Sequence, residues 1–316
     1  MDKIIWIYIS ILCLSVQCVF SQKDTLNTYM ISYKEKVITS VSLQNESNSF
    51  TVIEQDGNKS TNYELFPNLK QHITFGLTYK LLDVSFGYTP WFMKTNTSKY
   101  KSDNFNFSTR FNYKNWYQSV YFRKQKGFFT DYEDKTQVYV PTLRSIKVGG
   151  TVSYVLNKNF SYSALFNQNE WQIKSAGSLV VTASVFYTNL MNKGYRDDLT
   201  IEMYSISLAP AYYYTWVINK KVFLSGGLGV GAGIKIDQSK TAPLGELVFN
   251  TKLGYNTTNF YSYIELNGTD YFYNQNAVQI NDTFINSKIA VGFRFDPPKK
   301  VKKVYDDAIE TVEKII

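Results

Sequence analysis

The single histidine of the chain, His72, is the side chain best suited to acid–base chemistry near neutral pH. It lies in an alternating stretch, residues 71–90, that places Asp83 and Ser85 on the same face. Serine, histidine and a carboxylate are the groups of a hydrolytic triad, but no motif in the sequence marks a nucleophile. The same polar face would equally line the inside of a barrel. We therefore expect no enzyme and keep, as a weak alternative, a lipid-modifying hydrolase with His72, Asp83 and Ser85 as catalytic residues.

Metal and cofactor sites find little support in the sequence. One histidine excludes a multi-histidine metal centre, and both cysteines, Cys13 and Cys18, lie in the N-terminal apolar segment. The glycine row at positions 227, 229, 231 and 233 lacks the spacing of a dinucleotide fingerprint. Such a row predicts a tightly curved strand, or a bare wall that leaves room for an inward-folded loop or a solute. We predict no metal and no cofactor.

A set of charged residues is predicted to share the inward face of the strands. Cations on this face could select anions in a pore, whereas oppositely charged groups could pair across a filled interior. Both interpretations remain open from the sequence. The predicted lumen charges are Lys80, Asp83, Arg110, Lys147, Glu246, Lys252, Lys288 and Arg294.

The elements that would position these groups are β-strands. Residues 71–90 alternate with a period of two on both sides of a tight reversal, which predicts a hairpin of membrane-spanning length. Similar segments recur, joined by short turns near 81, 114, 157, 219 and 257, with long polar connections at 91–103 and 124–145. This pattern predicts an all-β fold, an antiparallel transmembrane β-barrel of about twelve strands with the short turns periplasmic. A soluble β-sandwich is the rival fold.

The ends of the chain indicate the cellular location of the protein and its division into domains. Residues 1–21 have a charged start, an apolar centre and a small residue before Gln22, which is typical of a secretory signal peptide. Residues 22–36 form a predicted periplasmic lead-in, and residues 37–295 form the barrel. In residues 296–316 two prolines precede a basic segment with helical spacing, which predicts a short C-terminal amphipathic tail helix. The expected location is the outer membrane of a Gram-negative bacterium.

One segment is more specific than barrel periodicity requires. Residues 160–177, FSYSALFNQNEWQIKSAG, carry polar and charged residues at spacings that alternation does not explain. This segment, together with residues 66–68, 126–129 and 210–214, resembles an uncharacterised domain-of-unknown-function family of Bacteroidota-type outer-membrane β-barrel-like proteins. The resemblance covers most of the chain up to about residue 258 and implies an envelope barrel without an assigned activity. We expect residues 167–177 either to fold inward or to extend a neighbouring strand.

The function expected from these observations is that of a narrow channel or a small-solute binder. The basic lumen face favours a small anionic solute, and the apolar strand faces favour outer-membrane lipid as the surrounding partner. The net charge of +8 is spread along the whole chain, so we expect no nucleic-acid partner. A non-transporting envelope scaffold that uses the C-terminal tail is a further alternative.

Overall fold

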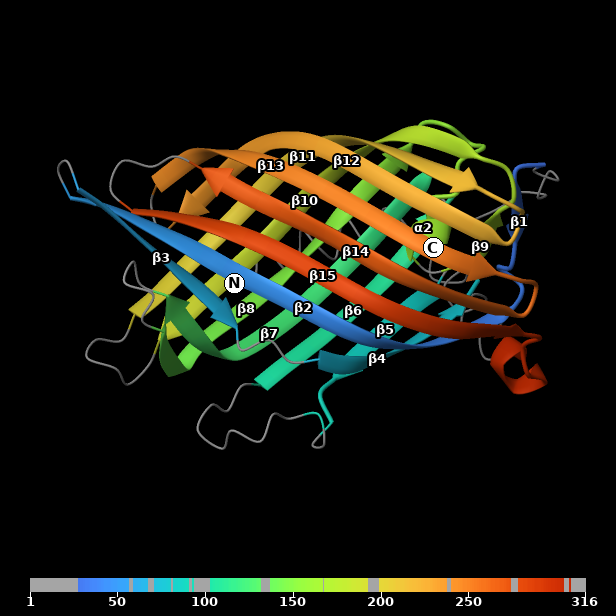
Figure 1. The fold of residues 1–316 in the computed structure, drawn as a ribbon, viewed down its shortest axis with the longest axis horizontal. Helices are drawn as coiled ribbons and strands as arrows, with labels where there is room; N and C mark the ends of the chain where they lie inside the picture. Colours follow the sequence, from blue (N-terminus) through green and yellow to red (C-terminus); the bar gives the residue numbers. More distant parts are fainter. Residues whose placement is uncertain are drawn as a thin grey trace.

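Twelve antiparallel strands in the described part of this computed structural model close into a barrel (Figure 1). The structure describes residues 28–56, 59–67, 71–80, 82–90, 93, 103–131, 137–166, 168–192, 199–237, 240–273, 278–303 and 307. The last strand pairs with the first, so the ring has no free edge within the bilayer. The ring order is β2 (Val37–Asp56), β4 (Gln71–Tyr79), β5 (Leu82–Tyr88), β6 (Asp103–Tyr113), β7 (Trp116–Asp131), β8 (Gln137–Val155), β10 (Ala176–Asn192), β11 (Leu199–Val217), β12 (Val222–Asp237), β13 (Lys240–Asn256), β14 (Phe260–Tyr273) and β15 (Val278–Phe295).

A further strand, β3 (Lys59–Pro67), completes only one end of the wall. It pairs with β2 from Phe50 onward and with the end of β7, whereas β4 pairs with the first half of β2. Thus β3 and β4 lie end to end along β2 and together make one crossing. The described wall consequently has twelve strands toward the end with the short turns, which the sequence predicts to be periplasmic and which we call the periplasmic end, and ten strands toward the opposite end.

The strands are longer than the sequence predicted. β2 is one strand of 20 residues, although alternation in the sequence is clear only in residues 37–43 and 50–54. β7 and β8 take up most of the predicted long connection 124–145. A tilted strand needs only about 9–11 residues to cross a bilayer. The additional length carries the barrel beyond the membrane on the side opposite the start of β2 and the end of β15.

Polarity reverses along several of the long strands, β2 among them. Near the periplasmic end, apolar side chains point outward, as Val41 and Leu43 do on β2. Further along the same strand, Phe50 and Val52 point inward and are almost fully buried. The first zone matches a lipid-facing wall, and the second matches a water-exposed barrel with an apolar interior. The prediction that alternate apolar residues face outward is therefore confirmed at positions such as Val41 and Leu43 and wrong at positions such as Phe50 and Val52.

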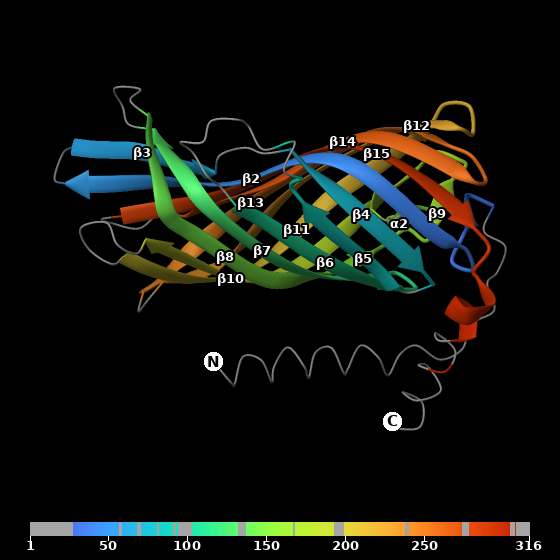
Figure 2. The same cartoon turned by 90° about the horizontal axis from the view of Figure 1, so that it is seen from below.

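The connection between β8 and β10 folds into the barrel as a plug, which we define as the described residues of 157–175. It contains α2 (Ser163–Phe166) and β9 (Glu170–Gln172), and both are buried. β9 pairs with β1 (Met30–Ser32), which lies in the predicted lead-in. Figures 1 and 2 place α2 and β9 within the ring, near the end from which the C-terminal segment leaves the barrel. Of the two alternatives for residues 167–177, inward folding is therefore correct for the part that the structure describes.

The glycine row lies on the inner side of β12 and sets how closely that strand approaches β11. A Cβ at Gly227 would lie 2.1 Å from Cδ1 of Tyr213, and one at Gly233 would lie 2.0 Å from the carbonyl oxygen of Ile206. Only residues without a side chain fit at these two places. The row therefore serves close strand packing and curvature instead of leaving an open wall.

Little of the two chain ends is described. The predicted signal peptide and all of the tail beyond residue 303, apart from Asp307, lie outside the described residues. The first part of the tail, residues 299–303, is helical and exposed. Within the described ranges, no helix is long and apolar enough to cross a membrane.

Candidate functional site

A cavity of about 230 Å³ occupies the middle of the barrel. On one side it meets the plug and the aromatic cluster around Tyr162 and Tyr213. On the other side it meets an apolar cluster that includes Phe186 and Tyr271 and fills the interior of the extended half. Along the barrel axis, side chains of the plug therefore close the described interior on one side of the cavity, and side chains of the apolar cluster close it on the other side.

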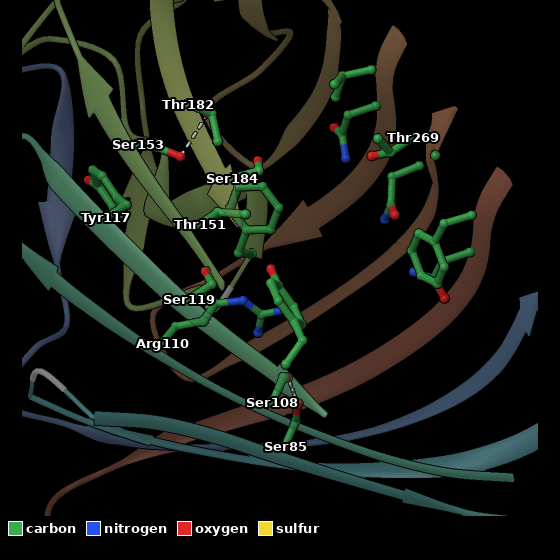
Figure 3. A pocket seen from close by; sticks show the side chains of 18 of the residues that line it. Ser85, Ser108, Arg110, Tyr117, Ser119, Thr151, Ser153, Thr182, Ser184 and Thr269 are labelled. Carbon is green, nitrogen blue, oxygen red and sulfur yellow. Dashed lines mark hydrogen bonds between the residues drawn. The ribbon is translucent and has the colours of Figure 1, made fainter. Parts of the chain in front are cut away.

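Hydroxyl groups cover one wall of this cavity (Figure 3). They project from β7, β8 and β10, which are adjacent in the ring, and Thr269 lies on another part of the cavity wall. Two pairs of hydroxyls bond to each other, Ser153 to Thr182 at 2.8 Å and Ser85 to Ser108 at 2.7 Å. The hydroxyl wall is Ser119, Thr151, Ser153, Thr182 and Ser184.

Ion pairs neutralise most of the charges around the cavity. Glu46 on β2 lies 2.5 Å from Arg123 on β7 and accepts a hydrogen bond from Asn106 on β6 at 2.7 Å. Asp282 on β15 accepts from Lys147 on β8, also at 2.7 Å. These groups come from strands far apart in sequence, so the pairs join strands that are not neighbours in the ring.

Two further ion pairs complete the set. Arg110 on β6 lies 3.1 Å from Asp83 on β5, and Lys252 on β13 lies 3.5 Å from Glu265 on β14. Asp83 also accepts a hydrogen bond from the hydroxyl of Thr78 at 3.0 Å. Each of these two pairs joins neighbouring strands of the ring.

Amide groups supply the hydrogen-bonding capacity that the protein leaves unused. Asn250 on β13 is 5% exposed and lines the cavity, and neither its oxygen nor its nitrogen has a partner among the described residues. The side-chain oxygens of Asn286 and Asn112, which also line the cavity, are likewise buried without a partner there. A buried polar group without a hydrogen bond destabilises a protein by about 1–3 kcal/mol, so such groups in a cavity indicate a place for a polar molecule.

Two buried cations of the barrel wall donate hydrogen bonds to the plug and attach it to the wall. Arg294 on β15 donates to the backbone oxygen of Gln168 and, at 2.7 Å, to the side chain of Asn256. Lys252 donates to the backbone oxygens of Ala164 and Leu165 at the end of α2. Charged donors on carbonyl oxygens make strong hydrogen bonds, and these satisfy backbone groups that the short helix leaves open.

Aromatic contacts complete the attachment of the plug. Tyr162 packs against Tyr117 and Tyr213 of the wall, with ring centroids 5.0 and 5.4 Å apart. Burial raises the pKa of the Tyr162 phenol well above its ordinary value, and burial also raises that of Tyr33 in the lead-in, although Arg294 opposes this. Both phenols stay neutral at physiological pH.

The three residues of the weak catalytic alternative all face inward, but the structure does not bring them together. The β4–β5 register places Ser85 opposite Gly76 and Asp83 opposite Thr78. His72 is four and six residues farther along β4 than these positions, a separation of about 13 and 20 Å along the strand. His72 lies instead 3.8 Å from Glu46.

The predicted lumen charges divide into two groups. Lys80 lies in the β4–β5 turn with a φ of 53°, where its backbone nitrogen donates to the carbonyl oxygen of Lys34, so its placement on the lumen wall was wrong. The others lie on the inner face of the barrel: Asp83, Arg110, Lys147, Glu246, Lys252, Lys288 and Arg294.

Sequence reasoning missed several inward charges. Glu46 lies between the two clearly alternating stretches of β2, although the even-numbered positions around it continue the inward pattern. Asp282 lies in the first part of β15, before the clearly alternating residues 288–295, whereas Glu265 lies within an alternating stretch and was simply not included in the inward set. Extending the period of two to the full strands would have found Glu46 and Asp282. In the described ranges, no group of three or more His, Cys, Asp or Glu side chains could hold a metal ion.

Comparison with known proteins identifies a family and a fold type. A family model described as "Domain of unknown function (DUF4421)" matches residues 22–295. No curated protein matches the chain. The comparisons with solved structures find barrels of low sequence identity, and similarity at this level does not bear on function.

Three of these solved structures illustrate the similarity. The outer membrane protease OmpT from Escherichia coli is 10% identical, with a TM-score of 0.38 over 84% of this chain and 98% of that one. The translocator domain of the autotransporter NalP from Neisseria meningitidis is 9% identical, with a TM-score of 0.40 over 91% and 96%. An outer membrane channel from Pseudomonas putida F1 is 11% identical, with a TM-score of 0.36 over 87% and 100%.

Proposed function

We propose that this chain, which belongs to the domain-of-unknown-function family DUF4421 and is an outer-membrane β-barrel, binds a small polar solute in its central cavity. The observation that carries the proposal is the unmatched hydrogen-bonding capacity of the cavity wall, above all the two amide atoms of Asn250. Functional pockets combine enclosure with a few polar groups that fix the orientation of a ligand. The cavity between the plug and the apolar cluster has both properties.

Binding fits the closed interior better than free passage does. The plug fills the periplasmic end of the ring, and the apolar cluster fills the extended half. An open pore needs a continuous aqueous path, which these two layers interrupt. Passage of the bound solute would require both layers to move. We therefore propose binding, and not free passage, as the function of the barrel.

Thermal unfolding of the purified protein in detergent tests the proposal. A panel of glucose, glucuronate, glucosamine, serine and inorganic phosphate is titrated, and at least one member should raise the Tm, because a ligand of the native state stabilises it by mass action. Ser119→Phe, which fills the cavity from the hydroxyl wall, should abolish that rise. Ser287→Phe makes the same change on the exposed outer surface of β15 and should leave the rise unchanged.

Two results would overturn the proposal. One is a panel in which no solute changes the Tm of the wild-type protein. The other is a rise that persists in full in a folded Ser119→Phe protein. Folding of each variant is checked by the change in electrophoretic mobility that a folded barrel shows when the sample is heated before the gel is run.

A further inference from the structure

We infer that the solute is an uncharged, polyhydroxylated molecule of about the size of a monosaccharide. This inference rests on the proposed binding function and names the substrate class of the same cavity. It departs from the sequence-based expectation of an anionic solute. Three observations carry it: the balance of charge, the unmatched hydrogen-bonding groups and the volume.

The charges around the cavity cancel. The described lining residues and their ion-pair partners comprise five cations and five carboxylates, and four of each form the pairs described above. Lys288 and Glu246 remain outside those pairs, one of each sign. Burying a net charge here without a partner would be strongly unfavourable, so the wall selects against charged solutes.

Aromatic rings also cover the cations, which restricts their approach to an anion. The guanidinium of Arg123 lies 3.8 Å from the ring centroid of Phe284, and that of Arg110 lies 5.8 Å from Phe166. The ammonium of Lys147 lies 5.2 Å from Phe186. Each of these three cations therefore has both a carboxylate and a ring beside it, which favours a structural role.

Apart from Lys288 and Glu246, which balance each other in charge, what remains available is neutral hydrogen bonding. Asn250 offers an amide donor and an acceptor, and Asn286 and Asn112 each offer an acceptor. The hydroxyl wall adds groups that both donate and accept. A sugar-like solute presents hydroxyls around its whole ring, and each hydroxyl both donates and accepts, so it matches this mixture better than an anion, which only accepts.

The volume sets the size of the solute. A cavity of 230 Å³ holds about 15–20 water-sized probes, so it has room for a solute of roughly a dozen non-hydrogen atoms. A hexose is of this size, and an oligosaccharide is not. Inward-facing aromatic residues of the lining, such as Tyr121 and Phe186, provide flat apolar faces for the C–H groups of a sugar ring.

Isothermal titration of the full barrel in detergent tests the inference with probes that share one ring but differ in charge. Glucose should bind at least about tenfold more tightly than glucuronate or glucosamine, because either charge would enter a balanced site unpaired. Serine, a zwitterion, tests whether Lys288 and Glu246 act as a matched pair for both charges.

A pair of variants separates binding from folding. Asn250→Leu should weaken glucose binding about tenfold and leave the Tm of the free protein unchanged or higher, since it removes buried groups that have no partner. Asn189→Leu makes the same change on the outer side of β10, where the amide bonds to Tyr187 and Glu202, and should leave glucose binding unchanged. A fall in Tm for Asn250→Leu with unchanged glucose binding would assign Asn250 a structural role and overturn the inference.

The outcomes distinguish the inference from the proposed function. Tighter binding of glucuronate, phosphate, glucosamine or serine than of glucose would overturn the neutral class and leave a solute-binding cavity. Absence of binding by every probe would remove both. Tightest binding by glucose, lost in Asn250→Leu, supports both.

Discussion

At the scale of single residues, Glu46 joins more strands than any other group described around the cavity. Its carboxylate contacts Gln44 on its own strand, His72 on β4, Asn106 on β6 and Arg123 on β7. It lies where β2 changes partner from β4 to β3, so it bridges the point at which the wall narrows from twelve strands to ten. Its role is to hold that junction together.

Breaking the Glu46–Arg123 pair should strongly destabilise the barrel. Glu46→Leu leaves a buried guanidinium uncompensated, and Arg123→Leu leaves a buried carboxylate uncompensated. Each should lower the free energy of unfolding by about 3–5 kcal/mol. The double variant should recover much of this loss, because two apolar side chains leave no unpaired charge. Urea unfolding of the barrel in lipid vesicles measures the cycle, and additive losses would show that the two groups do not act as a pair.

At the scale of elements, the plug explains the least regular part of the sequence. Residues 160–177 departed from alternation because their side chains serve a folded insert and not a wall. Gln172 accepts from the backbone of Ser161 and donates to the backbone oxygens of Asn159 and Lys174. Ser161 in turn donates to Glu170 at 2.6 Å. These polar residues build a compact loop within the lumen.

Removal of the plug should expose the cavity to the periplasm without creating a conducting pore. The mature chain is expected to lack cysteine, so Ser153→Cys places a single thiol at the cavity. In the intact barrel a membrane-impermeant maleimide should react with it slowly. Replacing residues 159–173 with a short turn should speed labelling at least about tenfold, while bilayer conductance stays low because the apolar cluster still closes the other half.

The control for this experiment is on the outer surface of the barrel. A cysteine at exposed Ser287 should label equally fast in both proteins, which verifies that the reagent is active, and the heat-dependent change in gel mobility verifies that the shortened barrel is folded. Rapid labelling at position 153 in the intact barrel would show that the plug does not seal the lumen. High conductance after shortening would show that the apolar cluster does not close it.

The same elements show how far sequence carries the fold. Period-two alternation identified the strands at their periplasmic ends, where lipid enforces outward apolar side chains, and it placed most inward charges correctly. It failed where polarity reverses, as between Leu43 and Phe50, because an inward apolar residue there resembles a new strand with the opposite face. β7 has a bulge at Gly127, which has a φ of 84°. Because of this bulge, odd-numbered residues such as Gln125 face inward before it, and even-numbered residues such as Phe128 face inward after it.

The cavity was harder to foresee than the strands. Pairs such as Asn48 with Asp282 are 234 residues apart and meet only because the ring closes. Alternation predicts which face of a strand a residue lies on. It does not predict the position of that residue along the barrel axis or its partner across the lumen. The balance of charge, and with it the case for a neutral solute, depends on those partners. The sequence alone therefore favoured an anion.

At the scale of the whole molecule, the same strands form two halves of the barrel that differ in the polarity of their inner and outer surfaces. Its periplasmic half has a polar interior and an apolar exterior, and its extended half has an apolar interior and a more polar exterior. The first is stable only in a bilayer, whereas the second follows the rule for proteins in water. The central cavity lies between them, where the interior changes from polar to apolar.

This division predicts opposite responses to one substitution. Leu228 on β12 points outward and is 73% exposed, six residues from the periplasmic end of its strand, which is about the depth of the bilayer midplane for a tilted strand. Leu228→Arg should therefore lower the stability of the folded barrel in vesicles by about 2–4 kcal/mol. Thr51→Arg, on the outer side of β2 and fourteen residues from its periplasmic end, should change it by less than about 0.5 kcal/mol.

Repeating both measurements in vesicles with longer acyl chains locates the boundary of the hydrocarbon. A thicker bilayer places outward positions farther along the strands in contact with lipid, so the penalty at Leu228 should persist while that at a position just above the apolar belt, such as Ser287→Arg, should grow. Because the outward side chains of β2 and β15 change from apolar to polar over only a few residues, the rise should be steep. Equal penalties at Leu228 and Thr51 in every bilayer would mean that the outer surface is not divided in this way, and the membrane position assigned to the barrel would be wrong.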